Sequence, residues 1–62
     1  MRGKQSIVLE QYKVFDENNN MMPIYRVVGL VNTVAFDIGH LFSRREVNEL
    51  IMNYQVTIRP AK

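Results

Sequence analysis

The most constraining feature of this 62-residue sequence is a helix start in its C-terminal third, followed closely by a strand pattern. Ser43 and Glu46 have the spacing of a capping box, in which each side chain accepts the backbone N–H of the other residue. Phe42 and Val47 have the spacing of the hydrophobic staple that fixes how a chain enters a helix. Residues 54–60 alternate between polar and apolar, which predicts a strand directly after the helix.

The helix and the final strand each supply one apolar face to the expected core. Val47, Leu50 and Ile51 lie on one side of a helix. Val56 and Ile58 lie on one side of the following strand. We therefore expect these five side chains to pack together.

The N-terminal half predicts a β-hairpin. Residues 6–16 are rich in β-forming side chains, and residues 24–31 form a second such run. Between them, the Asp- and Asn-rich residues 16–20 are a strong turn signal. The apolar positions of the first strand change phase, which suggests a bulge near residues 10–11. Gly29 suggests a second bulge or a close backbone approach.

Two features of the middle of the chain leave alternatives open. Residues 24–31 are apolar on both sides, so this strand is either covered twice or covered once and used as an interface. Residues 32–41 fit a strand by alternation and a helix by the spacing of Val34, Ile38 and Leu41. We favour a strand that ends at Gly39.

The expected fold is a single α+β domain over residues 1–62, with an antiparallel sheet of three or four strands and one α-helix packed on one face, in the order β-β-(β)-α-β. Residues 1–5 are expected to be a flexible tail.

Composition favours self-association. The sequence is 47% hydrophobic and contains three Phe, three Tyr and four Met, but it has no cysteine that could form a disulfide or a thiolate metal site. A chain of this length lies near the lower limit for a self-sufficient core. We therefore expect a homodimer.

Charge and hydropathy indicate no nucleic-acid or membrane specialisation. The net charge is +2, and the eight basic residues are scattered along the sequence. Dedicated DNA-binding proteins usually concentrate such charge on one face, so nucleic-acid binding is possible but not favoured. No apolar run approaches the roughly 20 residues that cross a bilayer, and the apolar stretch near the N-terminus is too short for a signal peptide. The expected location is the cytoplasm.

Few residues suggest chemistry. His40 is the single histidine, and Asp37 and Glu46 lie near it in sequence, but metal and catalytic sites need more groups and a pocket. We expect no enzyme activity, cofactor or metal. Arg44 and Arg45 could contact phosphates at the helix N-terminus, or they could be solvated side chains. A larger set could form a hydrophobic contact surface or serve as core and dimer interface: Met21, Met22, Tyr25, Phe36, Phe42 and Met52.

The order of elements and several short motifs resemble the small uracil-DNA glycosylase inhibitors of short-tailed bacteriophages. The residues that carry this resemblance are Tyr12-Lys13-Val14, Asp16 to Asn20, Tyr25, Gly29-Leu30 and Phe36-Asp37-Ile38. The resemblance implies a dimer that blocks the DNA-binding cleft of a host repair enzyme, with Phe36 and Asp37 near the contact. The chain departs from that family in being basic, whereas those inhibitors have acidic surfaces, and in the extended structure expected at Phe36-Asp37.

The functional prediction is a small non-enzymatic interaction protein, encoded by a phage or mobile element, that inhibits a host enzyme by occluding its surface. The alternative is a small basic nucleic-acid-binding regulator that uses four arginines on phosphates: Arg26, Arg44, Arg45 and Arg59. The predicted partner-binding residues are Tyr25, Phe36, Asp37, His40, Arg44 and Arg45.

Overall fold

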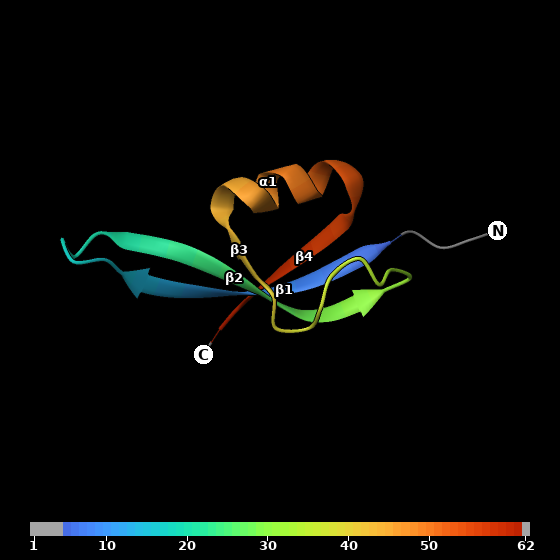
Figure 1. The fold of residues 1–62 in the computed structure, drawn as a ribbon, viewed down its shortest axis with the longest axis horizontal. Helices are drawn as coiled ribbons and strands as arrows, with labels where there is room; N and C mark the ends of the chain where they lie inside the picture. Colours follow the sequence, from blue (N-terminus) through green and yellow to red (C-terminus); the bar gives the residue numbers. More distant parts are fainter. Residues whose placement is uncertain (1–4, 62) are drawn as a thin grey trace.

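The computed structural model describes residues 5–61, which form a four-stranded sheet with one helix on one face (Figure 1). The elements are β1 (Ser6–Phe15), β2 (Met21–Val31), β3 (Leu41–Ser43), α1 (Arg44–Asn53) and β4 (Gln55–Pro60). The strand order across the sheet is β3-β2-β1-β4. The α+β class and the single helix on one face are confirmed, but the prediction of a purely antiparallel sheet is wrong.

The sheet is mixed because β4 runs parallel to β1. The pairing extends from Ser6 opposite Gln55 to Gln11 opposite Pro60. Helix α1 begins directly after β3 at one edge of the sheet and crosses to the other edge, so that β4 runs in the same direction as β3 (Figure 1). A helical crossover of this kind joins strands that point the same way. Alternation along β4 reveals its faces but not its direction.

The start of α1 follows the sequence prediction. Glu46 donates its backbone N–H to Ser43 Oγ at 3.3 Å, and Ser43 donates its backbone N–H to Glu46 Oε1 at 2.8 Å. Both halves of the capping box are therefore present. The flanking staple residues, Phe42 and Val47, are both buried in the core.

The turn between β1 and β2 is also confirmed. Asp16 Oδ1 accepts the backbone N–H groups of Asn18 at 2.8 Å and Asn20 at 2.9 Å. Asn19 adopts a φ of 64°, the left-handed conformation that asparagine tolerates. These bonds, chiefly the one from the Asn20 N–H, hold the pKa of the Asp16 carboxyl below its ordinary value.

The bulge lies in the second strand, so its predicted position near residues 10–11 is wrong. Val8 pairs with Gly29 and Leu9 pairs with Val27, which leaves Val28 as the extra residue. Strand β1 is regular, and its apparent change of phase arises because it carries apolar side chains on both faces. At Gly29 a Cβ would lie 3.3 Å from Val8 Cβ, which is the close approach expected there.

Residues 32–40 form a loop, so the favoured strand ending at Gly39 is wrong. Asn32 has a φ of 61° and Gly39 a φ of 94°, and such left-handed residues at each end interrupt an extended strand. The third strand begins only after Gly39, and its three residues pair with Ile24 to Arg26 of β2.

The core lies between α1 and the covered face of the sheet. Its buried side chains are Ile7, Leu9, Tyr25, Val27, Phe42, Val47 and Leu50. Val56 and Ile58 pack against this cluster as expected, with part of their surface exposed. Ile51 is not part of this packing and is 51% exposed. The expected tail at residues 1–5 lies outside the described residues except for Gln5, whose carbonyl accepts the Gln55 N–H at 3.0 Å.

The molecule is elongated, with dimensions of 49 × 22 × 17 Å. Figure 1 shows that the turn end of the β1–β2 hairpin projects well beyond the helix. A large share of the apolar side chains remains exposed in such a thin body. Ten of them are at least 39% exposed: Val14, Phe15, Met21, Met22, Val31, Val34, Ile38, Leu41, Ile51 and Met52.

Candidate functional site

The loop of residues 32–40 is fixed to the body of the protein by aromatic packing. The half-buried Phe36 ring meets Phe42 edge-on at a centroid distance of 5.2 Å and Tyr54 at 5.6 Å. The His40 ring lies 4.6 Å from the Phe42 ring. Edge-to-face pairs at such distances contribute about 0.5–1.5 kcal/mol each beyond their burial. The loop therefore has its own small aromatic anchor beside the core.

Backbone hydrogen bonds attach the end of this loop to β2. The Gly39 N–H donates to the Val27 carbonyl at 2.7 Å, and the Val27 N–H donates to the His40 carbonyl at 2.9 Å. Within the loop, the His40 N–H donates to the Asp37 carbonyl at 3.1 Å. Main-chain and side-chain contacts together hold the segment in one conformation.

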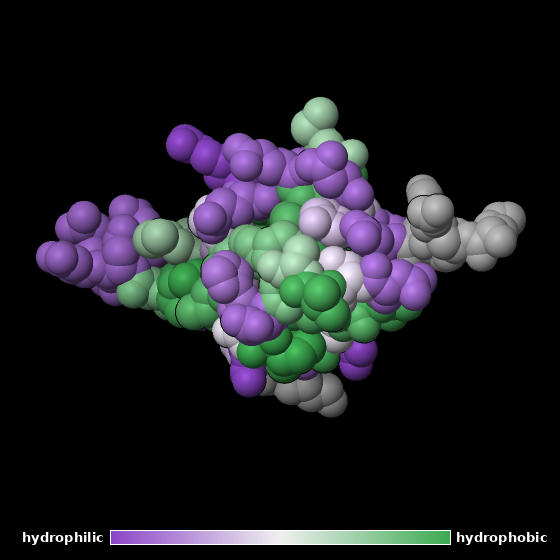
Figure 2. Space-filling model, turned by 45° about the vertical axis from the view of Figure 1, so that its right-hand side comes forward, coloured by the Kyte–Doolittle hydropathy of each residue, from purple (hydrophilic) through white to green (hydrophobic). Residues whose placement is uncertain are grey.

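The anchored loop presents apolar side chains to solvent. Val34 is 96% exposed and Ile38 is 60% exposed, with the exposed Asp37 next to Ile38. We call Val34, Asp37 and Ile38 the loop surface. In Figure 2 hydrophobic side chains gather in the centre and lower part of the view, while hydrophilic ones cover the helix above and the hairpin end. Val34 and Ile38 were not among the partner-binding residues predicted from the sequence, because both were assigned to a strand.

Tyr25 and Arg44 form a separate contact at the N-terminus of α1. Arg44 Nη1 donates to the Tyr25 hydroxyl at 3.2 Å, and the guanidinium carbon lies 5.9 Å from the Tyr25 ring centroid. Tyr25 is only 2% exposed, so its ring belongs to the core. Arg45 is exposed. The predicted site residues thus divide between this pair, the loop with Phe36, Asp37 and His40, and the lone Arg45.

His40 and Glu46, the ionisable side chains nearest the helix start, make contacts that fix the local structure. His40 is exposed and contacts Phe36 and Phe42 through its ring. The pKa of Glu46 lies below its ordinary value because its carboxylate accepts the Ser43 backbone N–H and interacts with the Ser43 hydroxyl, with a smaller contribution from the charge of His40. Within residues 5–61, no three His, Cys, Asp or Glu side chains are grouped so that they could hold a metal ion.

The arginines proposed for phosphate contacts lie on opposite sides of the sheet. Arg26 and Arg59 flank Glu10 in one row across the sheet. The side chains of that row alternate with the buried Leu9 and Tyr25 and so project from the face that α1 leaves open. Arg44 and Arg45 lie on α1, on the covered side. These four residues therefore do not form one basic surface.

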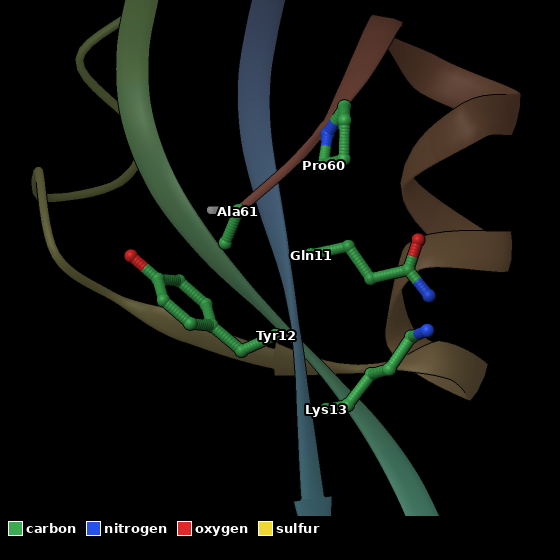
Figure 3. A pocket seen from close by; sticks show the side chains of 5 residues that line it. All are labelled: Gln11, Tyr12, Lys13, Pro60 and Ala61. Carbon is green, nitrogen blue, oxygen red and sulfur yellow. The ribbon is translucent and has the colours of Figure 1, made fainter.

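A surface hollow of about 350 Å³ lies where β4 ends beside β1, and it is lined by Gln11, Tyr12, Lys13, Pro60 and Ala61. Figure 3 shows Gln11 and Lys13 projecting toward the helix side, while Tyr12 projects to the opposite side. The hollow therefore straddles the edge of the sheet. Its two ionisable side chains, Tyr12 and Lys13, point in different directions.

Comparison with known protein families, curated proteins and solved structures finds no match to this chain. The comparisons neither support nor refute the resemblance to uracil-DNA glycosylase inhibitors. In the part of the chain that the structure describes, no helix has the length and apolar character needed to span a bilayer.

Proposed function

We propose that this chain is a small non-enzymatic interaction protein that acts in the cytoplasm by covering the surface of another protein. The observation that carries the proposal is the loop surface. Val34 and Ile38 are held in solvent by a segment that Phe36 anchors with two aromatic contacts. Fixed apolar side chains on a loop reduce the conformational entropy lost on binding, so such a loop is well suited to contact a partner.

The chemistry of the loop surface favours a protein partner. Its two aliphatic side chains can supply an apolar centre, and the exposed Asp37 and His40 of the same loop can supply polar groups. Protein interfaces commonly combine an apolar centre with a polar rim. The specific form that we propose is inhibition of a host enzyme by a protein of phage or mobile-element origin, acting as a homodimer. A DNA-repair glycosylase is the first enzyme to test, and this choice rests on the sequence resemblance alone.

The direct test is a glycosylase assay with a uracil-containing oligonucleotide, a bacterial uracil-DNA glycosylase and increasing amounts of this protein. We expect inhibition by the wild type and at least a tenfold weaker effect from the double variant Val34→Ser, Ile38→Ser, since truncating central interface residues commonly costs more than about 1.4 kcal/mol. Full glycosylase activity at a large molar excess of the wild type would exclude this enzyme as the target.

A second experiment tests the wider proposal without assuming the enzyme. Wild-type protein and the Val34→Ser, Ile38→Ser variant are immobilised and exposed to bacterial lysate at 0.5 M salt. A protein retained by the wild type and lost from the variant supports the loop surface as the binding site. Equal retention by both proteins would contradict it.

Nucleic-acid binding is the second candidate, and the placement of the arginines does not favour it. Arg26 and Arg59 are separated from Arg44 and Arg45 by the thickness of the sheet, so one duplex would not contact all four. Phosphate-driven binding weakens steeply with salt through counterion release. Labelled single-stranded and duplex DNA at low salt would reveal such binding, and a strongly salt-dependent complex would support this alternative.

A further inference from the structure

The face of the sheet opposite α1 is unusually apolar for a solvent-facing surface. We call it the open face. It contains a shallow groove of about 330 Å³ that is lined by Tyr12, Val14, Ile24, Arg26 and Leu41. Leu41 is 56% exposed, and Met22, next to this groove in the pairing, is 47% exposed. No element of residues 5–61 covers this face.

Charged residues cross the open face in a single row. The row begins at the apolar Leu41 on β3. Its charged members are Arg26 on β2, Glu10 on β1 and Arg59 on β4. Within residues 5–61 neither arginine forms an ion pair with Glu10, whose carboxylate instead accepts the Tyr12 hydroxyl at 2.7 Å. Opposite charges thus lie side by side on an apolar surface without pairing inside the chain.

We infer that the open face binds the open face of a second copy of this chain, around a two-fold axis that runs along the hairpin between β1 and β2. Such an axis places each β1 residue of one copy over its β2 pairing partner in the other copy. Arg26 then meets Glu10 of the second copy, and the same contact occurs twice because a two-fold interface repeats every contact.

The neighbouring rows fit the same arrangement. The pairs Tyr12–Ile24 and Val14–Met22 follow the Glu10–Arg26 pair along the hairpin on the same face. Around the proposed axis, Tyr12 of one copy lies over Ile24 of the other, and apolar side chains meet apolar side chains in each row. A two-fold axis along the strands leaves the strands of the two sheets nearly aligned, and aligned packing is one of the two common ways in which sheets pack face to face.

The exposed area of the chain agrees with one such interface. The chain exposes 4940 Å², whereas a compact monomer of 7.3 kDa is expected to expose about 4,200 Å². The excess of roughly 700 Å² reflects the elongated shape of the chain, which leaves surface for an interface of the standard ~800 Å² per partner. This inference rests on the homodimer in the proposed function, to which it assigns a surface separate from the loop surface.

The test is a set of charge reversals, measured by sedimentation over a range of protein concentrations. We expect the wild type to have a mass about twice that of the chain. Glu10→Arg places arginine against arginine, and Arg26→Glu places glutamate against glutamate, so each single variant should dissociate roughly tenfold or more readily. The double variant Glu10→Arg, Arg26→Glu should recover the dimer, and so should an equimolar mixture of the two single variants.

Substitutions at three apolar positions test where the interface lies. Leu41→Lys should also weaken the dimer, whereas Ile51→Lys should not, because Ile51 has a similar exposure of 51% but lies on α1. Val34→Ser should keep the dimer even if it loses the target protein, which separates this inference from the proposed binding site. A monomeric wild type at 100 µM or more would overturn the inference. Rescue of Glu10→Arg by Arg59→Glu instead of Arg26→Glu would overturn the position of the axis.

Discussion

Replacing Phe36 with alanine should release the loop of residues 32–40 and destabilise the protein. Full burial of a phenylalanine side chain contributes about 1.5–3 kcal/mol, and Phe36 is only half-buried. Two edge-on aromatic contacts, with Phe42 and Tyr54, add to this contribution. We therefore expect a loss of about 1.5–2.5 kcal/mol, which is a large part of the roughly 3–9 kcal/mol that a domain of this size has available.

The assay is urea unfolding followed by circular dichroism, at a fixed protein concentration because the protein is proposed to dimerise. With a slope near 1 kcal/mol per molar urea, the midpoint should fall by roughly 1.5–2.5 M. Val34→Ala is the matched control, because Val34 belongs to the same loop but is 96% exposed, and its midpoint should hardly move. A Phe36→Ala midpoint equal to that of the control would refute the argument that aromatic packing anchors the loop.

Three further predictions concern the helix start, a glycine and two carboxyls. Ser43→Ala removes the side chain that caps α1 and should lower the free energy of unfolding by about 1 kcal/mol, while Ser43→Asp should retain most of it in the same urea assay. Gly39→Ala should cost about 1–3 kcal/mol through backbone strain alone, since φ is 94° and no atom lies within 4 Å of the added Cβ; an unchanged melting temperature would contradict this. The carboxyl pKa values of Asp16 and Glu46 are lower in the folded state than their ordinary values of 3.8 and 4.5. Their contribution to stability is therefore complete when the pH is above these ordinary values. It is lost as the pH falls through the lower pKa values of the folded state. The melting temperature should therefore fall on acidification below about pH 4.5, and this fall should be smaller in Glu46→Gln, which loses the linked proton.

Local patterns in the sequence were sufficient to predict the features that depend on neighbouring residues. The cap at Ser43 and Glu46 and the turn at residues 16–20 involve hydrogen bonds that span only two to four positions. Both could be read from residue types at fixed spacings. The strand over residues 55–60 could also be predicted from local pattern, because its alternating residues correspond to one partly buried face and one exposed face.

Features set by distant partners could not be predicted in this way. The direction of β4 depends on where α1 ends relative to the sheet. The bulge at Val28 depends on how β2 aligns with β1. The conformation of residues 32–40 depends on the packing of Phe36 against Phe42 and Tyr54. The alternation of apolar and polar residues carries no information on these contacts and suggested a strand. For the same reason the sequence left open whether Tyr25 lies in a contact surface or in the core, and tertiary packing buries its ring.

The parallel pairing of β4 with β1 has a consequence for how the protein is made. Strand β4 follows β1, β2 and β3 in the sequence and completes the pairing of β1, so the edge of β1 at Ile7 and Leu9 stays unpaired until β4 has been synthesised and can fold. Contacts between such distant positions slow folding, and an unfinished chain with exposed strand edges is prone to aggregate. Deletion of β4 should therefore yield a chain that accumulates in inclusion bodies, because the hairpin and helix alone would lack the strand that closes the core.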